Sequence, residues 1–126
     1  MLDKKKFYIN GEWVEPINPN NFEVINPSTE DVCAVINLGS SDDTNSAVAA
    51  ARNAFETWKE TSKEERLQFL EKLLKIYKAR WDDMTDAITT ELGCPKDWCS
   101  ANQTSSGAGH IAVSYTHLTL PTKRIV

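Results

Sequence analysis

The sequence of 126 residues lacks the features that mark two large classes of protein. It carries 14 Lys and Arg against 18 Asp and Glu, a formal net charge of −4, whereas proteins that bind nucleic acid through its phosphates need clustered positive charge. No apolar run approaches the roughly 20 residues of a membrane-spanning helix. We therefore expect neither nucleic acid nor a membrane as a partner.

Cysteine is scarce, and the number of cysteines is odd. Cys33, Cys94 and Cys99 fit a reducing compartment better than a disulfide framework, so we expect unpaired thiols. The basic start at Lys4–Lys6 leads into a segment too short and too polar for a signal peptide, which predicts a cytoplasmic protein. A zinc site on Cys94, Cys99 and His110 is the alternative, but it lacks the paired Cys-x-x-Cys spacing.

The residues that are present describe a globular chain long enough for one core, with 40% hydrophobic residues and four tryptophans. Its first third predicts short strands. Asn10-Gly11 accepts the positive φ angles of a tight turn and lies between β-forming residues, which predicts a hairpin over 6–14. Segments 22–25 and 32–38 continue the strand pattern, and we expect a small antiparallel layer.

From residue 40 onward the apolar residues recur every three or four positions, which is typical of amphipathic helices. Ser40 or Ser41 can cap the first helix, and Ser62-Lys63-Glu64-Glu65 has the form of a capping box that starts the second. A third helix is expected to end at Gly93, and a weaker pattern predicts a fourth over 98–113. The residues predicted to share apolar faces are Val48, Ala51, Phe55, Trp58, Leu67, Leu70, Leu73, Leu74, Tyr77, Trp81, Met84, Ile88 and Leu92.

Five motifs follow one another in a distinctive order along the chain. They are Phe7-Tyr8-Ile9-Asn10-Gly11-Glu12-Trp13, Val24-Ile25-Asn26-Pro27-Ser28-Thr29-Glu30, the stretch from Ala47 to Trp58, Glu65-Arg66, and Thr90-Glu91-Leu92-Gly93. In order and spacing they resemble the start of the NAD(P)-dependent aldehyde dehydrogenases. The resemblance covers about residues 6–113, so we expect the amino-terminal part of such an enzyme's domain there.

This resemblance implies a parent protein with an α/β fold, in which this part supplies short antiparallel hairpin strands followed by three or four helices. It also implies an oxidoreductase that converts an aldehyde to a carboxylic acid and passes a hydride to NAD or NADP. In that family a cysteine thiolate attacks the aldehyde, a glutamate acts as base, and amides stabilise the oxyanion. The implied assembly of the parent is a homodimer or homotetramer.

None of these catalytic or cofactor-binding residues can be assigned in this chain. The family's nucleophile lies in a Gly-Gln-x-Cys segment, and none of the three cysteines has that setting. Gly107-Ala108-Gly109 lacks the preceding strand of a dinucleotide-binding turn, which favours a helix or loop of small residues. We therefore expect the chain to be inactive by itself. The alternative is a stand-alone helical module that binds a partner through the apolar faces of 67–92.

One metal site is implied by the resemblance. Several family members bind potassium or sodium through main-chain oxygens near a strand and a carboxylate at a helix end. The matching positions are Val24, Ile25 and Glu91, and oxygen ligands suit such hard cations. The alternative for Glu91 is a solvated or helix-pairing carboxylate without a ligand role.

The last residues, 114–126, depart from the family pattern. Their Thr-rich, β-leaning composition looks like the translated adapter ends found on assembled environmental reading frames. We interpret this segment as a non-native tail. The alternative, a genuine terminus, would place Leu118 and Leu120 in alternation on a paired strand.

Overall fold

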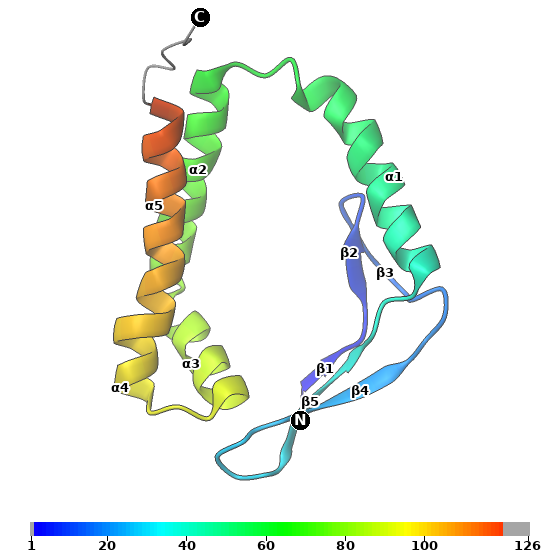
Figure 1. Cartoon of the computed structure of the whole chain (residues 1–126), viewed down its shortest axis with the longest axis vertical. Helices are drawn as coiled ribbons and strands as arrows, with labels where there is room; N and C mark the ends of the chain where they lie inside the picture. Colours follow the sequence, from blue (N-terminus) through cyan, green and yellow to red (C-terminus); the bar gives the residue numbers. More distant parts are fainter. Residues whose placement is uncertain (1, 120–126) are drawn as a thin grey trace, which may run out of the picture. The chain divides into compact units, whose positions relative to one another are not determined.

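The computed structural model describes residues 2–119. Its strands are β1 (Leu2–Lys4), β2 (Phe7–Ile9), β3 (Glu12–Val14), β4 (Asn21–Ile25) and β5 (Val32–Asn37). Its helices are α1 (Ser41–Trp58), α2 (Lys63–Ala79), α3 (Trp81–Leu92), α4 (Lys96–Trp98) and α5 (Ser105–Thr119), with a π-helical turn η1 (Cys99–Thr104) before α5 (Figure 1). The chain forms two compact units, which are described separately. The first contains the described residues up to Glu60 together with Thr90–Gly93, and the second contains Thr61–Thr89 and the described residues from Cys94 onward.

The predicted hairpin is confirmed as the pair β2 and β3. Phe7 pairs with Val14 and Ile9 with Glu12, which leaves Asn10-Gly11 as the two-residue turn. Both turn residues have positive φ, 55° for Asn10 and 84° for Gly11. This is the backbone that a tight hairpin turn requires and that this dipeptide accepts at little cost.

The other strands form a three-stranded sheet in the order β1-β5-β4. The antiparallel pairing of β4 and β5 follows the prediction, but β1 pairs with β5 in parallel, so the expectation of an entirely antiparallel layer was wrong for this strand. Leu2–Lys4 is exposed and shows no alternation of apolar residues, which is why its strand was not predicted. A tertiary contact holds the segment: the side-chain amide of buried Asn37 donates a hydrogen bond of 2.9 Å to the Lys5 carbonyl.

Helix α1 is capped by Ser40, one of the two predicted caps, in a capping box with Asp43 that was not predicted. The Asp43 carboxylate also accepts a hydrogen bond of 2.8 Å from the Ile17 backbone N–H, which ties the loop after the hairpin to the helix start. This backbone bond, followed by the bonds from Ser40, lowers the pKa of Asp43 because all of them favour the charged carboxylate.

Helix α2 begins at the predicted capping box. The Glu65 amide donates to the Ser62 hydroxyl, and the Ser62 backbone N–H donates to the Glu65 carboxylate at 2.7 Å. The backbone and side chain of Ser62 together lower the pKa of Glu65. The predicted helix starts were therefore correct because each was determined by four adjacent residues.

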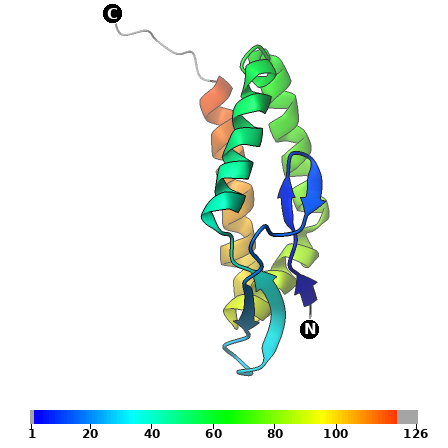
Figure 2. The ribbon, with the colours of Figure 1, turned by 90° about the vertical axis from the view of Figure 1, so that its right-hand side faces the viewer.

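Helices α2 and α5 lie side by side in the second unit (Figure 1; Figure 2 gives the view turned by 90°). Polar groups join α2 and α3 to η1, the turn that leads into α5: the Tyr77 hydroxyl of α2 donates to the Thr104 carbonyl at 3.0 Å, and the hydroxyls of Thr85 in α3 and Thr104 share a hydrogen bond of 2.9 Å. Both threonines are almost completely buried. The Trp81 indole N–H donates to the Ser100 hydroxyl at 2.9 Å, so η1 is anchored to α3 as well.

The fourth predicted helix is longer and less regular than expected. It is present as α4, η1 and α5, and α5 continues without a break through Ser114 to Thr119. The β-leaning interpretation of this stretch was therefore wrong up to Thr119: Leu118 lies on a helix, and Leu120 lies outside the described residues. Tyr115 is half-buried, and its hydrogen bond to Glu71 raises the pKa of the phenol. The proposed boundary of the non-native tail at Ser114 stays a prediction.

Most of the predicted apolar helix faces remain open to solvent. Phe55 is 47% exposed, Trp58 43% and Leu73 48%, whereas the buried apolar side chains among the described residues are Ala34 and Cys99. None of the helices described in residues 2–119 is both long enough and apolar enough to cross a membrane.

Candidate functional site

The two strand residues of the predicted cation site lie at an irregular point of the sheet. Val24 pairs with Ala34 and Ile25 with Val32, so the register shifts between them. The Val24 carbonyl accepts a hydrogen bond of 3.3 Å from the Cys33 thiol. A thiol is a weak donor, and an irregular ladder leaves carbonyl groups incompletely paired, so backbone oxygen is available at this strand end.

Glu91, the third predicted ligand, is exposed on the last turn of α3. The helix stops at Gly93, whose φ of 68° belongs to the left-handed region. A Cβ atom on Gly93 would lie 2.7 Å from Cγ of Pro27 and 2.9 Å from the backbone nitrogen of Ser28. The end of α3 thus packs closely on the turn that directly follows β4.

This contact brings together two segments that are more than sixty residues apart in the sequence. Both belong to the first unit, so the strand end with Val24 and Ile25 and the helix end with Glu91 are parts of one compact body. Carbonyl oxygens and one carboxylate are a donor set that suits a hard monovalent cation. The role of the three residues as ligands stays a prediction.

The cysteines differ from what was expected. Cys94 and Cys99 form a disulfide, whereas Cys33 is free and half-buried. The expectation of three unpaired thiols was therefore wrong for two of them. The cause is the turn of Cys94-Pro95 into α4, which returns the chain so that the two Cα atoms are 6.3 Å apart, within the range of a disulfide.

The alternative of a zinc site gains no support from the described part of the chain. Both sulfurs of Cys94 and Cys99 are used in the disulfide, and residues 2–119 contain no group of three or more His, Cys, Asp or Glu residues placed to hold a metal. Spacing alone had not identified the disulfide, although two cysteines five residues apart across a proline turn are a signal for it.

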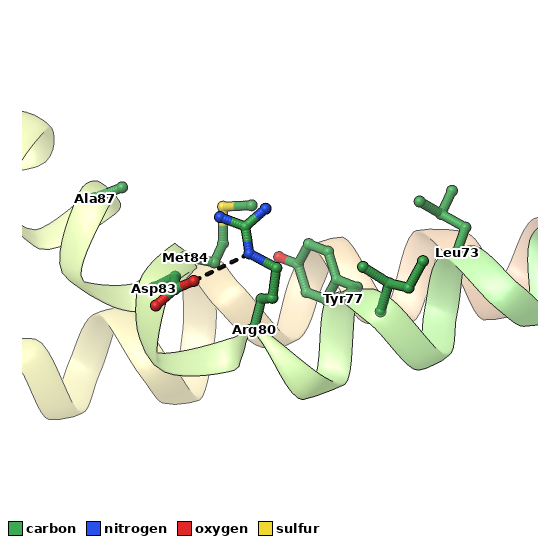
Figure 3. Close-up of a pocket in the computed structure, with 7 residues that line it drawn as sticks. Leu73, Tyr77, Arg80, Asp83, Met84 and Ala87 are labelled. Atoms are coloured by element: carbon green, nitrogen blue, oxygen red, sulfur yellow. Dashed lines mark hydrogen bonds and ion pairs between the residues drawn. The ribbon is translucent and has the colours of Figure 1, made fainter.

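A groove of about 310 Å³ lies on the second unit, lined by residues of α2 and α3 and by Arg80 between them. Leu73, Met84 and Ala87 give it an apolar lining, and Figure 3 shows the Arg80 guanidinium paired with Asp83 across 3.0 Å. Its one hydroxyl, on Tyr77, is already engaged with Thr104. The groove therefore presents an apolar surface and no paired nucleophile and base.

No dinucleotide-binding turn is found at the glycine-rich segment. Gly107-Ala108-Gly109 lies within α5, one turn from its start, and the π-helical turn η1 precedes it instead of a strand. Of the two alternatives left by the sequence, a helix or a loop of small residues, the structure shows the helix.

Comparison with known proteins identifies the family. Residues 13–123 match the model of the aldehyde dehydrogenase family. A relative of this chain is 3-succinoylsemialdehyde-pyridine dehydrogenase from a Pseudomonas species, which is 40% identical over 111 residues, covering 87% of this chain and 23% of that protein.

Solved structures give the same result. An aldehyde dehydrogenase from Bartonella henselae superposes with a TM-score of 0.95 at 45% identity, covering 100% of this chain and 27% of that one. Aldehyde dehydrogenase C from Pseudomonas syringae, solved with NAD+ and octanal, gives a TM-score of 0.91 at 36% identity over 97% of this chain and 25% of its own. This chain thus spans about a quarter of the length of these relatives. The match of the family model over most of the sequence shows that the chain belongs to the aldehyde dehydrogenase family.

Proposed function

We propose that this chain is the amino-terminal part of an NAD(P)-dependent aldehyde dehydrogenase that oxidises an aldehyde to a carboxylic acid. The observation that carries this proposal is its family membership together with its share of about a quarter of each relative's length. A Pseudomonas syringae relative has been solved with both NAD+ and octanal, which supports a nicotinamide and an aldehyde as the reactants. The family match disfavours the alternative of a stand-alone interaction module.

The role of this part is structural support for a site built by the rest of the protein. Its strands and helices provide faces for packing, and Cys33, Cys94 and Cys99 lie outside the sequence setting of the family's nucleophile. The groove lined by α2 and α3 contains no pair of nucleophile and base. The isolated chain therefore does not turn over aldehydes, whereas the complete enzyme does.

A chimera tests this proposal. Residues 1–113 replace the aligned segment of the Bartonella henselae enzyme, and formation of NADH or NADPH from octanal is followed by absorbance. We expect the chimera to retain activity and the isolated chain to show none. The unmodified Bartonella enzyme is the control for substrate choice and assembly. A chimera that folds and assembles like this control but lacks activity contradicts the proposal. So does turnover by the isolated chain that disappears when one cysteine is replaced.

The proposal includes a monovalent cation on the carbonyls of Val24 and Ile25 and the carboxylate of Glu91. The support is the irregular strand end and the close packing of the α3 end on the turn after β4. In the chimera, potassium raises the melting temperature relative to choline, and Glu91→Gln removes that rise. The matched control is Glu56→Gln on exposed α1. An equal potassium effect in all three proteins contradicts the assignment.

The complete protein is further proposed to be cytoplasmic and to assemble as a homodimer or homotetramer. The exposed apolar residues on its helices are compatible with assembly, since such faces need a covering surface. Fractionation of cells and light scattering of the chimera test these two points.

A further inference from the structure

The two cysteines of the disulfide have different access to solvent. Cys99 is completely buried at the start of η1, whereas Cys94 is half-buried in the turn that precedes α4. Cys94 is therefore the cysteine of this pair that is partly open to solvent, whereas Cys99 is enclosed by the protein. Access is one of the factors that decide which sulfur reacts first in thiol–disulfide exchange.

The backbone between these cysteines is held by interactions that do not involve sulfur. Pro95 restricts the chain at the start of α4, and its carbonyl accepts a hydrogen bond of 2.9 Å from the Cys99 backbone N–H. This bond keeps the two Cα atoms near 6.3 Å, the separation seen in the disulfide. The two thiols would consequently remain within reach of one another after reduction.

We propose that Cys94 and Cys99 are a reversible dithiol–disulfide couple, with Cys94 as the thiol that reacts with low-molecular-weight disulfides and Cys99 as the resolving thiol. In a cytoplasmic protein, disulfides are mostly transient or redox-sensing and seldom permanent supports. The assignment rests on the geometry of the second unit and does not depend on the proposed aldehyde oxidation.

The exchange has two steps. The Cys94 thiolate attacks one sulfur of oxidised glutathione, so the reagent's S–S bond breaks, a mixed disulfide forms at Cys94, and one glutathione leaves. The Cys99 thiolate then attacks the Cys94 sulfur, so the mixed disulfide breaks and the second glutathione leaves. Two protein thiols are oxidised and one reagent disulfide is reduced, and the two thiol protons of the protein end on the two glutathione molecules.

Oxidation affects a segment that anchors two helices. Cys99 is the first residue of η1, and this turn carries Ser100 and Thr104, which bond to Trp81 and Tyr77. Joining Cys99 to Cys94 adds a covalent restraint at the start of η1, and reduction removes this restraint while the hydrogen bond from the Cys99 N–H to the Pro95 carbonyl remains. The redox state of the two cysteines thereby sets the local stability of η1 at its Cys99 end.

The test uses the full chain, equilibrated in buffers of varied reduced and oxidised glutathione. After an acid quench, thiols are alkylated in denaturant and located by mass spectrometry. We expect one alkylated cysteine, Cys33, in oxidising buffer and all three in reducing buffer. The control Cys33→Ser should show the same two-thiol transition. Full alkylation in every buffer, or a disulfide that includes Cys33, overturns the proposal.

Two further variants test the assigned order of reaction. Cys99→Ser should accumulate a stable glutathione adduct on Cys94, because the resolving thiol is missing. Cys94→Ser should accumulate several-fold less adduct, because Cys99 is buried. Equal adduct in both variants refutes the assigned roles. Hydrogen exchange of the wild-type chain completes the test: amides 99–104 should exchange faster after reduction, and unchanged rates refute the restraint of η1.

Discussion

Gly107 and Gly109 occupy the same helix but should respond in opposite directions to the same substitution. A Cβ on Gly107 would lie 2.8 Å from Cζ and 3.3 Å from Cε2 of Tyr77, whereas a Cβ on Gly109 would meet nothing within 4 Å. The Tyr77 ring cannot easily move away, because its hydroxyl is bonded to Thr104 and its ring makes an edge contact with Trp81. The close approach of α2 and α5 therefore requires glycine at 107.

The expected free energies follow from three contributions. Replacing glycine by alanine inside a helix stabilises it by about 0.5–1 kcal/mol, and Gly109→Ala should gain about this amount. Gly107→Ala makes the same gain but forces overpacking, which costs about 1–3 kcal/mol. Disturbing the hydrogen bond from Tyr77 to Thr104 costs about 0.5–1.5 kcal/mol more. The net effect at Gly107 is a destabilisation of about 0.5–4 kcal/mol.

Urea unfolding followed by circular dichroism measures both variants. We expect the midpoint to rise for Gly109→Ala and to fall for Gly107→Ala. In the background Tyr77→Phe the ring lacks its hydroxyl, so part of the clash at Gly107 is relieved and the effects of the two substitutions are not additive. If Gly107→Ala is as stable as Gly109→Ala, the packing of α5 on α2 described above is incorrect.

Three other predictions test separate parts of the fold. Gly93→Ala should destabilise the first unit by about 2–4 kcal/mol, because alanine is strained at this positive φ and its Cβ would press on Ser28. Gly11→Ala in the hairpin turn should cost only the strain of the positive φ, about 1–2 kcal/mol, because its Cβ would meet nothing. The urea midpoints of the two variants test this difference. The lowered pKa of Asp43 stabilises the fold fully above the ordinary aspartate pKa, and this stabilisation is lost as the pH falls through the lowered pKa. The unmodified chain should therefore be more stable than Asp43→Asn near neutral pH, and this difference should shrink toward low pH. Equal differences between the two urea midpoints at all pH values would contradict this. Removing 114–126 should change stability by no more than about 0.5 kcal/mol if the tail is non-native, and a fall of several degrees in melting temperature would show that it belongs to the fold.

Local sequence signals predicted the elements whose geometry is decided by a few adjacent residues. Asn10-Gly11 predicted the hairpin, because this dipeptide accepts the backbone of a two-residue turn. Ser62 and Glu65 predicted the start of α2 as a capping box, and the start of α1 was predicted at Ser40 or Ser41, of which the structure uses Ser40. Gly93 predicted the end of α3 for a similar reason, as its left-handed backbone stops the helix.

Features that depend on the path of the chain in space were not predicted. The parallel pairing of β1 with β5 joins Leu2 to Ala34, and nothing in the short exposed strand announces it. The disulfide between Cys94 and Cys99 depends on the path of the turn between them. The continuation of α5 to Thr119 depends on packing against α2, which overrides the β-leaning composition of its last residues.

The candidate cation site was reached from the sequence by resemblance alone. Val24 and Glu91 share no local pattern, and the contact that brings their segments together passes through Gly93 and Pro27. That contact requires glycine at position 93, because the residue there has a positive φ and leaves no room for a side chain. The role of Gly93 in ending α3 was therefore predictable from the sequence, whereas its packing against the turn at Pro27 and Ser28 was visible only in the structure.

The exposed helix faces show that an apolar helical period does not by itself produce burial. The apolar period of α1 is clear in the sequence, yet Phe55 and Trp58 remain 47% and 43% exposed. Apolar periodicity indicates which face of a helix is suited to burial, but that face is buried only when another helix or a sheet covers it. Relatives about four times as long contain additional chain that can provide such a layer. The pattern of this sequence is therefore consistent with the packing of a complete aldehyde dehydrogenase, and its open faces mark where the rest of such an enzyme would be expected to bind.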